Sequence, residues 1–221
     1  MRTNLRIPAN SRILIRRYSQ IRSIRRLVLL MRKITLDIET TNFFTDTGSN
    51  DPASLSLACV CVHDSTTDMY RSFFEEDLPK LWPMLEGADM LIGYNSDHFD
   101  IPILNKYYPG DLKAIKSVDL MKEIQKALGR RIGLGAIASA TLGKNKSADG
   151  GLAIQWWRQG ERQKVVDYCI DDVRITKELY DHALRHGKVK YPDGKMLRDI
   201  ILDTSEWEKK NEHVLTHTLP F

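Results

Sequence analysis

The sequence predicts an α/β protein built on a mixed sheet. Three apolar segments separated by polar turns come first, and this order is typical of an antiparallel meander. Strand-like segments then alternate with helix-like segments, which favours parallel pairing. The 221 residues, 42% hydrophobic and 28% charged, are enough for one substantial core.

The meander is expected at three ranges near the start of the chain. The first strand covers 33–37 and is followed by a polar loop at 40–52. The second strand covers 55–63, and the third covers 69–74 after a turn at 64–67. Alternating apolar residues and Gly, Asn or Asp in the loops support this order.

The remaining elements are delimited by apolar periodicity, helix caps, and Pro or Gly breaks. In chain order they are a helix at 75–85 whose last turn Pro83 disturbs, a strand at 89–94, a helix at 101–108, a strand at 115–118, a helix capped by Asp119 and running through Leu128, a small-residue segment at 132–142, an exposed basic loop at 143–146, and helices at 152–158 and 164–186. A hairpin with a turn at 192–195 and a loose end follow. These elements predict five strands flanked by helices.

The first residues differ in charge from the rest of the chain. Ten of the 33 basic residues and none of the acidic ones lie in 1–33, which leaves 23 basic against 29 acidic residues, a net charge of −6, in 34–221. The leader, 1–30, has the composition of a transit peptide or of a disordered nucleic-acid-binding arm. Alternatively, translation starts at Met31 and the leader is an extension. The expected domain covers 31–187, with a hairpin and tail at 188–221.

The cysteines and the longest apolar run bear on the compartment. Cys59, Cys61 and Cys169 are a sparse and odd set, which fits a reducing compartment. Cys59 and Cys61 share one strand face, and we interpret them as small core residues rather than as metal ligands. No stretch approaches the roughly 18–20 uninterrupted apolar residues of a membrane span, so no membrane partner is expected. We expect a cytoplasmic protein, or a mitochondrial one if the leader is a transit peptide.

Acidic side chains at three places suggest a metal site. Asp37 and Glu39 alternate with apolar residues, so both carboxylates lie on one strand face and invite a divalent cation. Asp100 stands between a strand end and a helix start. Tyr168 and Asp172 are four apart and share a helix face. Each feature alone has an ordinary explanation: a wet strand face, a helix cap and a surface pair.

Taken together, the three segments form a family pattern. They read Asp37-x-Glu39, then Tyr94-Asn95-x-x-x-Phe99-Asp100 with Pro102, then Tyr168-Cys169-x-x-Asp172. This pattern resembles the motifs of the DEDD, or DnaQ-like, 3′–5′ exonucleases of the tyrosine (DEDDy) type, with wording similar to the proofreading domain of family B DNA polymerases. The resemblance covers roughly 33–186. It implies an RNase H-like mixed five-stranded sheet whose first three strands are antiparallel.

The resemblance also implies a chemistry. Asp37, Glu39, Asp100 and Asp172 would hold two divalent cations, Mg²⁺ or Mn²⁺, and Tyr168 would position the attacking water. Asp37 would contact both ions. The expected reaction is metal-dependent hydrolysis at the 3′ end of single-stranded DNA or RNA, with release of nucleoside monophosphates. Four acids in one cleft repel one another, so we expect raised carboxyl pKa values without metal.

Two positions in this pattern have competing neighbours, because Asp97 and Asp171 lie close to Asp100 and Asp172 in sequence. Spacing from Tyr168 favours Asp172, and adjacency to Phe99 favours Asp100. Substrate contacts are predicted at Thr40, Asn95, Phe99, Lys144 and Lys146, with further candidates at Phe43, Phe44, Arg130 and Arg131. Aromatic rings stack on bases and basic side chains contact phosphates. Core packing and a solvated charge cluster are the alternatives.

Two rival functions stay open at this point. One is an RNase H-like nucleic-acid-binding module with a catalytically weak site. The other is a hydrolase of short oligonucleotides, which the net acidic body favours because long nucleic acids usually meet a basic face. From the length of the chain we expect no polymerase domain after the exonuclease and hence no proofreading in cis. A polymerase or helicase partner in trans is left open.

Overall fold

The computed structural model describes residues 31–144 and 150–209. The expectations for the leader, 1–30, and for Lys146 lie outside these residues. Within the described ranges, no helix combines the length and the apolar character needed to cross a bilayer.

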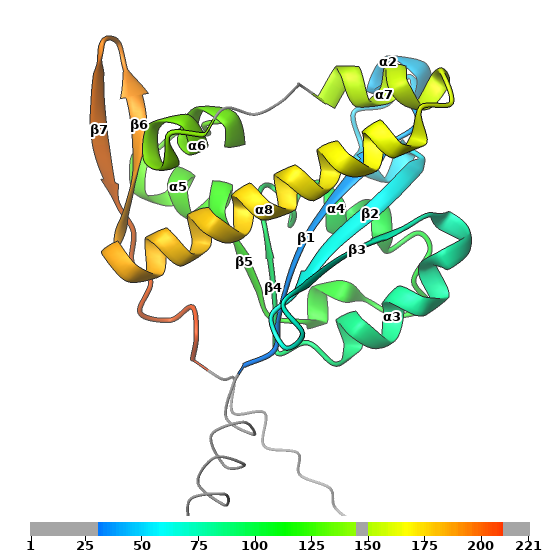
Figure 1. Cartoon of the computed structure of the whole chain (residues 1–221), viewed down its shortest axis with the longest axis horizontal. Helices are drawn as coiled ribbons and strands as arrows, with labels where there is room; N and C mark the ends of the chain where they lie inside the picture. Colours follow the sequence, from blue (N-terminus) through cyan, green and yellow to red (C-terminus); the bar gives the residue numbers. More distant parts are fainter. Residues whose placement is uncertain (1–30, 145–149, 210–221) are drawn as a thin grey trace, which may run out of the picture. The chain divides into compact units, whose positions relative to one another are not determined.

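A five-stranded sheet forms the centre of the fold (Figure 1). Its strands are β1 (Lys33–Thr40), β2 (Leu57–Asp64), β3 (Met69–Phe73), β4 (Met90–Gly93) and β5 (Ser117–Asp119). They lie in the order β3-β2-β1-β4-β5. β1 pairs with β2, and β2 with β3, in antiparallel fashion, whereas β4 is parallel to both β1 and β5. The predicted α/β class and the opening meander are confirmed.

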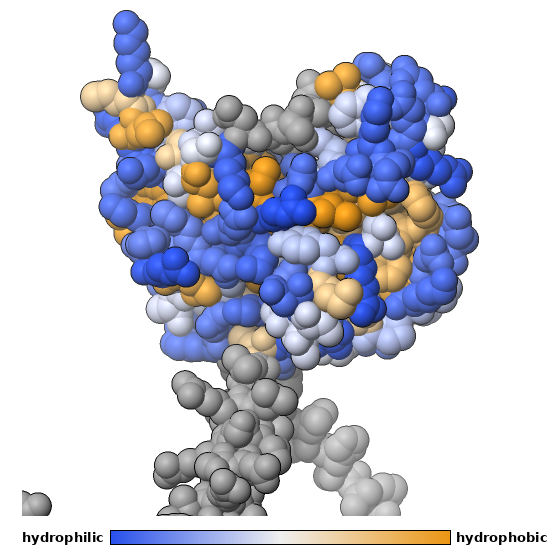
Figure 2. Space-filling model, in the orientation of Figure 1, coloured by the Kyte–Doolittle hydropathy of each residue, from blue (hydrophilic) through white to orange (hydrophobic). Residues whose placement is uncertain are grey.

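Helices flank this sheet. They are α2 (Phe44–Thr47), α3 (Leu78–Glu86), α4 (Asp100–Leu104), α5 (Leu120–Leu128), α6 (Leu134–Leu142), α7 (Gly150–Arg158) and α8 (Arg162–His186). The 25-residue α8 crosses one face of the sheet and contacts β1 to β4 (Figure 1). On the side shown in Figure 2, the surface is mainly hydrophilic and its hydrophobic residues form separate patches. A long helix with one buried and one polar side fits this position.

Apolar side chains of β1 define the other face of the sheet. Ile34, Leu36 and Ile38 alternate along the strand, so all three point the same way. They belong to one buried cluster with Leu81 of α3 and Leu104 of α4. Leu36 and Ile38 therefore anchor the strand opposite to the acids, as their alternation predicts.

The face beneath α8 has a separate core. It contains Cys59 and Cys61 of β2 together with Val165, Cys169 and Val173 of α8. All five residues have no exposed surface. The predicted role of Cys59 and Cys61 as core residues agrees with this burial, and α8 is held to the sheet by the same cluster.

Several predicted boundaries were wrong. The first strand continues to Thr40, so both acids of the first motif lie within it. The helix predicted at 101–108 ends at Leu104, because Asn105 turns to the next loop: its Oδ1 accepts from Leu112 N (2.9 Å) and its Nδ2 donates to Asp111 (2.9 Å). Asp119 caps α5 as predicted, accepting from Met121 N and Lys122 N.

The predicted hairpin is present as β6 (Lys188–Asp193) and β7 (Met196–Ile201). It joins α6 through Thr141, whose Oγ1 accepts from Lys190 N at 2.9 Å. The loose end expected after it was wrong for the described residues. Trp207 is buried and stacks on Tyr180 of α8 with ring centroids 5.4 Å apart, because a large aromatic side chain gains from leaving water.

Candidate active site

The acids of the first motif lie on the α8 side of β1. Asp37 and Glu39 alternate with the buried residues that face α3 and α4. In the register with β2, Asp37 stands opposite Cys61 and Glu39 opposite Cys59, and opposed residues share a face. The register shifts after Glu39, so the strand bends away just beyond the two carboxylates.

Asp172 of α8 meets these two acids. One carboxylate oxygen from each of Asp37, Glu39 and Asp172 lies within 4.8 Å of the others. Glu39 and Asp172 are buried, and Asp37 is half-buried. The helix thus brings a residue distant in sequence to the strand, which is the convergence that the motif pattern implies.

The turns of α8 separate the two neighbouring aspartates. Asp172 is 3% exposed, whereas Asp171 lies at the surface and forms an ion pair with Arg174. Tyr168, one turn before Asp172, is 3% exposed and its ring meets Trp156 edge-on at 6.1 Å. This arrangement favours Asp172 over Asp171 as the inward-facing acid.

Asp100 opens α4 immediately after a tight turn from β4. Asn95 has a φ of 69°, and its N–H donates to Asp119 at 2.8 Å. Gly93 is required nearby, because a Cβ there would come within 2.2 Å of Ser96 Oγ. The turn leaves Asp100 buried at 4% exposure.

Asp97 is engaged elsewhere. Its carboxylate accepts from Ser117 Oγ at 2.7 Å and forms an ion pair with Lys122 at 2.8 Å. Both contacts hold the turn against β5 and α5. Asp97 is therefore a structural residue of the turn, which favours Asp100 as the acid of the second motif.

The Asp100 carboxyl is strongly perturbed. Burial, followed by the charges of Asp119 and Asp172, raises the pKa of Asp100 to about 8. Burial also raises the pKa of Asp119. The expected rise of a carboxyl pKa in the metal-free cleft is met at Asp100, because a low-polarity environment disfavours the carboxylate form.

These residues line one cavity of about 310 Å³. Its lining includes the predicted Asp37, Glu39, Thr40, Asn95, Phe99, Asp100, Tyr168 and Asp172. Asp100 lines the same cavity but is not one of the three acids whose carboxylate oxygens all lie within 4.8 Å of one another. The cavity therefore unites the motif residues.

Aromatic rings form another wall. Phe44 of α2 meets Phe99 edge-on with centroids 6.3 Å apart, and Phe43 also lines the cavity. Leu55 and Ile154 complete the apolar lining. Leu55 and Ile154 could not be selected from the sequence, because an apolar residue at a cavity wall has the same local pattern as any core residue. The resulting surface suits the flat face of a base.

The predicted basic contacts lie elsewhere. Lys144 forms an ion pair with Glu178 at 2.7 Å and is not part of the cavity lining. Arg130 stacks over Tyr191. Arg131 donates to Asn95 Oδ1 and so contacts a residue of the cavity wall. Among the predicted basic residues that the structure describes, Arg131 is therefore the one that contacts the cavity wall directly.

The donor set fits a hard divalent cation. Mg²⁺ and Mn²⁺ prefer oxygen ligands, and the three converging side chains offer carboxylates alone. Placing such carboxylates together in a buried site is unfavourable without positive charge. Asp37, Glu39 and Asp172 are the residues that would hold such an ion.

Comparison with known proteins relates the chain to one protein family and to solved structures. A model of the RNase H superfamily matches residues 34–184. The solved structure of the family B DNA polymerase from the hyperthermophilic archaeon Pyrobaculum calidifontis is similar, with a TM-score of 0.55 and 19% identity over 70% of this chain and 25% of the polymerase chain. This likeness bears on the fold, and the chain spans about a quarter of the polymerase. No curated protein matches.

Proposed function

The chain belongs to the RNase H superfamily, and we propose that it is a metal-dependent 3′–5′ exonuclease that removes nucleoside monophosphates from single-stranded DNA or RNA. The main support is the convergence of Asp37, Glu39 and Asp172, whose carboxylate oxygens lie within 4.8 Å of one another in a cavity. The ordered motif pattern and the presence of Tyr168 in the same lining favour a nuclease of the tyrosine type.

The acids have distinct roles in this proposal. Asp37 would bind both of two ions, and Glu39 and Asp172 would complete the site for one of them. Asp100, which lines the same cavity, would bind the second ion in its ionised form. Bound Mg²⁺ or Mn²⁺ would lower the pKa of water and neutralise charge on the phosphate and the leaving oxygen.

Tyr168 is a positioning group for the nucleophile. Its ring is buried, meets Trp156 edge-on and belongs to the cavity lining. A phenol hydroxyl can both donate and accept a hydrogen bond. Tyr168 would therefore orient the water through a hydrogen bond.

The apolar wall binds the terminal nucleotide. Phe44 and Phe99 offer ring surfaces near the acids, and base stacking tolerates any base. The cavity of about 310 Å³ suits one terminal residue of a frayed strand rather than a duplex. This wall accounts for a sequence-tolerant reaction at single-stranded ends.

A labelled-oligonucleotide assay tests the proposal. Wild-type protein with Mg²⁺ or Mn²⁺ should shorten a 5′-labelled single strand one nucleotide at a time, and EDTA should stop the reaction. An oligonucleotide with a blocked 3′ hydroxyl should resist. Matched DNA and RNA strands of several lengths identify the preferred substrate.

Asp37→Ala should abolish this activity while preserving the fold measured by circular dichroism. Asp171→Ala is a matched control, because its carboxylate pairs with Arg174 and is not part of the cavity lining. Binding of single strands by wild-type protein without degradation under any metal condition would instead favour the non-catalytic binding module.

One observation favours a second candidate, a hydrolase of short oligonucleotides. Residues 34–221 carry a net charge of −6, which disfavours long polyanions. If the protein is such a hydrolase, it should cleave strands of two to five residues faster than longer ones. A rate that is constant or rises with length would exclude it.

A further inference from the structure

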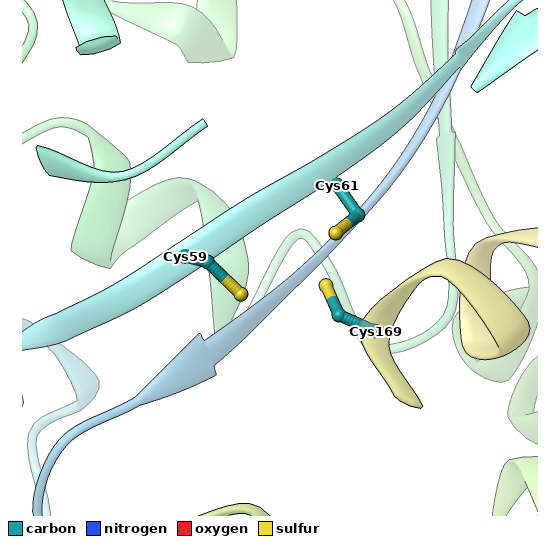
Figure 3. A group of neighbouring side chains, drawn as sticks. All are labelled: Cys59, Cys61 and Cys169. Atoms are coloured by element: carbon teal, nitrogen blue, oxygen red, sulfur yellow. The ribbon is translucent and has the colours of Figure 1, made fainter. Parts of the chain in front are cut away.

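The three cysteines meet beneath α8. Cys59 and Cys61 project from β2, and Cys169 projects toward them from α8 (Figure 3). Their sulfur atoms all lie within 4.8 Å of one another. Each is a free thiol without exposed surface. Two elements about 110 residues apart in sequence thus form a compact group of three sulfur ligands.

The number and type of ligands restrict what this group can bind. Hard ions such as Mg²⁺ prefer oxygen. Structural Zn²⁺ takes four ligands, whereas among the described residues this cluster offers three. Cu⁺ accepts sulfur, but three thiolates around a monovalent ion leave negative charge in a site without solvent, which is costly. A trivalent atom that prefers sulfur can form one bond to each of the three thiolates, and the resulting site carries no net charge.

We propose that Cys59, Cys61 and Cys169 form a binding site for trivalent arsenic supplied as arsenite. Arsenite is uncharged As(OH)₃ at neutral pH. Three As–S bonds form, three S–H and three As–O bonds break, and three water molecules leave. Arsenic stays trivalent and no electron is transferred.

Burial decides the kinetics of this reaction. The thiols are covered by α8 and by Ala153 of α7, so a ligand enters only when these helices move locally from the sheet. Only the small fraction of molecules that is locally open can react, so local opening limits the rate of arsenite capture. Capture is therefore slow and accelerates with moderate heating below the unfolding temperature.

The site adjoins the candidate active site. Cys169 follows Tyr168 in sequence, and its thiol donates to the Asp37 carbonyl oxygen at 3.3 Å. Loss of the thiol proton on arsenic binding removes this hydrogen bond, so arsenite inhibits the nuclease. This consequence depends on the proposed function, whereas the capture of arsenic does not.

Native mass spectrometry of the full chain after reduction, incubation with arsenite and desalting tests the site. The expected adduct contains one arsenic atom and no arsenic-bound hydroxyl, since all three are lost as water. An adduct that retains a hydroxyl would indicate two thiols and would overturn the three-sulfur site. Absence of any adduct after incubation at raised temperature would overturn it as well.

Three variants and one control locate the site. Cys59→Ala, Cys61→Ala and Cys169→Ala should each lose the hydroxyl-free adduct, and any one that retains it contradicts the proposal. Asp37→Ala should bind arsenic like the wild type although it lacks nuclease activity, which separates this site from the proposed function. If a cysteine variant does not fold, the adduct mass of the wild type still decides.

Discussion

The two faces of the central sheet use the same strands for different purposes. Toward α3 and α4, β1 presents Ile34, Leu36 and Ile38, which are buried among other apolar side chains. Toward α8, the intervening positions include Asp37 and Glu39. The alternation of a strand makes this separation possible, because neighbouring residues belong to different environments.

Stability and chemistry reside on different faces of the sheet. The α3 and α4 face removes apolar surface from water, at about 25 cal/mol per Å². The α8 face gathers like charges, which costs stability unless positive charge compensates them. Apolar burial on the α3 and α4 face therefore offsets the unfavourable free energy of gathering the acids on the α8 face. Changes on the two faces should therefore separate activity from stability.

The largest effect is expected at Asp172 on the α8 side. Asp172→Ala should lower nuclease activity at least about 100-fold. Loss of a residue that only hydrogen-bonds to a metal ligand costs about 10–100-fold in activity, and loss of a proposed ligand should cost no less. Asp171→Ala, which changes the adjacent half-exposed acid, should stay near the wild-type rate. The assay is release of nucleoside monophosphates under saturating Mg²⁺. Equal losses in both variants would contradict the separation of helix faces.

On the opposite face, Leu36→Ala should act on stability. Leu36 is 1% exposed, and removing a buried leucine side chain costs about 2–5 kcal/mol. Urea unfolding measures this change in the free energy of unfolding. The activity of the folded fraction should be preserved, because Leu36 points away from the cavity. A lost rate at unchanged stability would show that the faces are not separate.

The metal-free protein should lose stability as pH rises. The folded pKa of Asp100, about 8, exceeds its ordinary value of 3.8, so folding favours the protonated carboxyl. Its contribution is fully present below the lower value and is lost as pH rises through the higher one. Thermal unfolding in EDTA should show this decline, and Asp100→Asn should weaken it. If the stability of Asp100→Asn falls with pH as steeply as that of the wild type, other groups cause the decline.

The smallest difference is expected between Val60 and Cys61, adjacent buried residues of β2 that face opposite sides. Val60→Ala removes two methyl-sized groups and should cost about 1.6 kcal/mol or more. Cys61→Ala removes one sulfur atom and should cost about 1 kcal/mol. Urea midpoints measure both. A much larger loss for Cys61→Ala would make the thiol cluster a main contributor to stability.

Much of the fold follows from local pattern. The opening meander, the long last helix and the hairpin turn were predictable because alternation, 3.6-residue periodicity and turn residues are encoded over short stretches. The helix ending at Leu104 was missed, since the competing partner of Asn105 is the later loop at Asp111 and Leu112. The packing of Trp207 on Tyr180 was missed for the same reason, as its partner is distant in sequence.

The candidate site divides in the same way. The local sequence pattern already indicated which acids share a strand face or a helix face, because those relations follow from backbone periodicity. The tertiary packing brought Asp172 to Asp37 and Glu39 and placed Asp100 in the lining of the same cavity. It also brought Cys169 to Cys59 and Cys61. Such distances depend on how α8 packs across the sheet, and packing is set by the whole core rather than by any one segment.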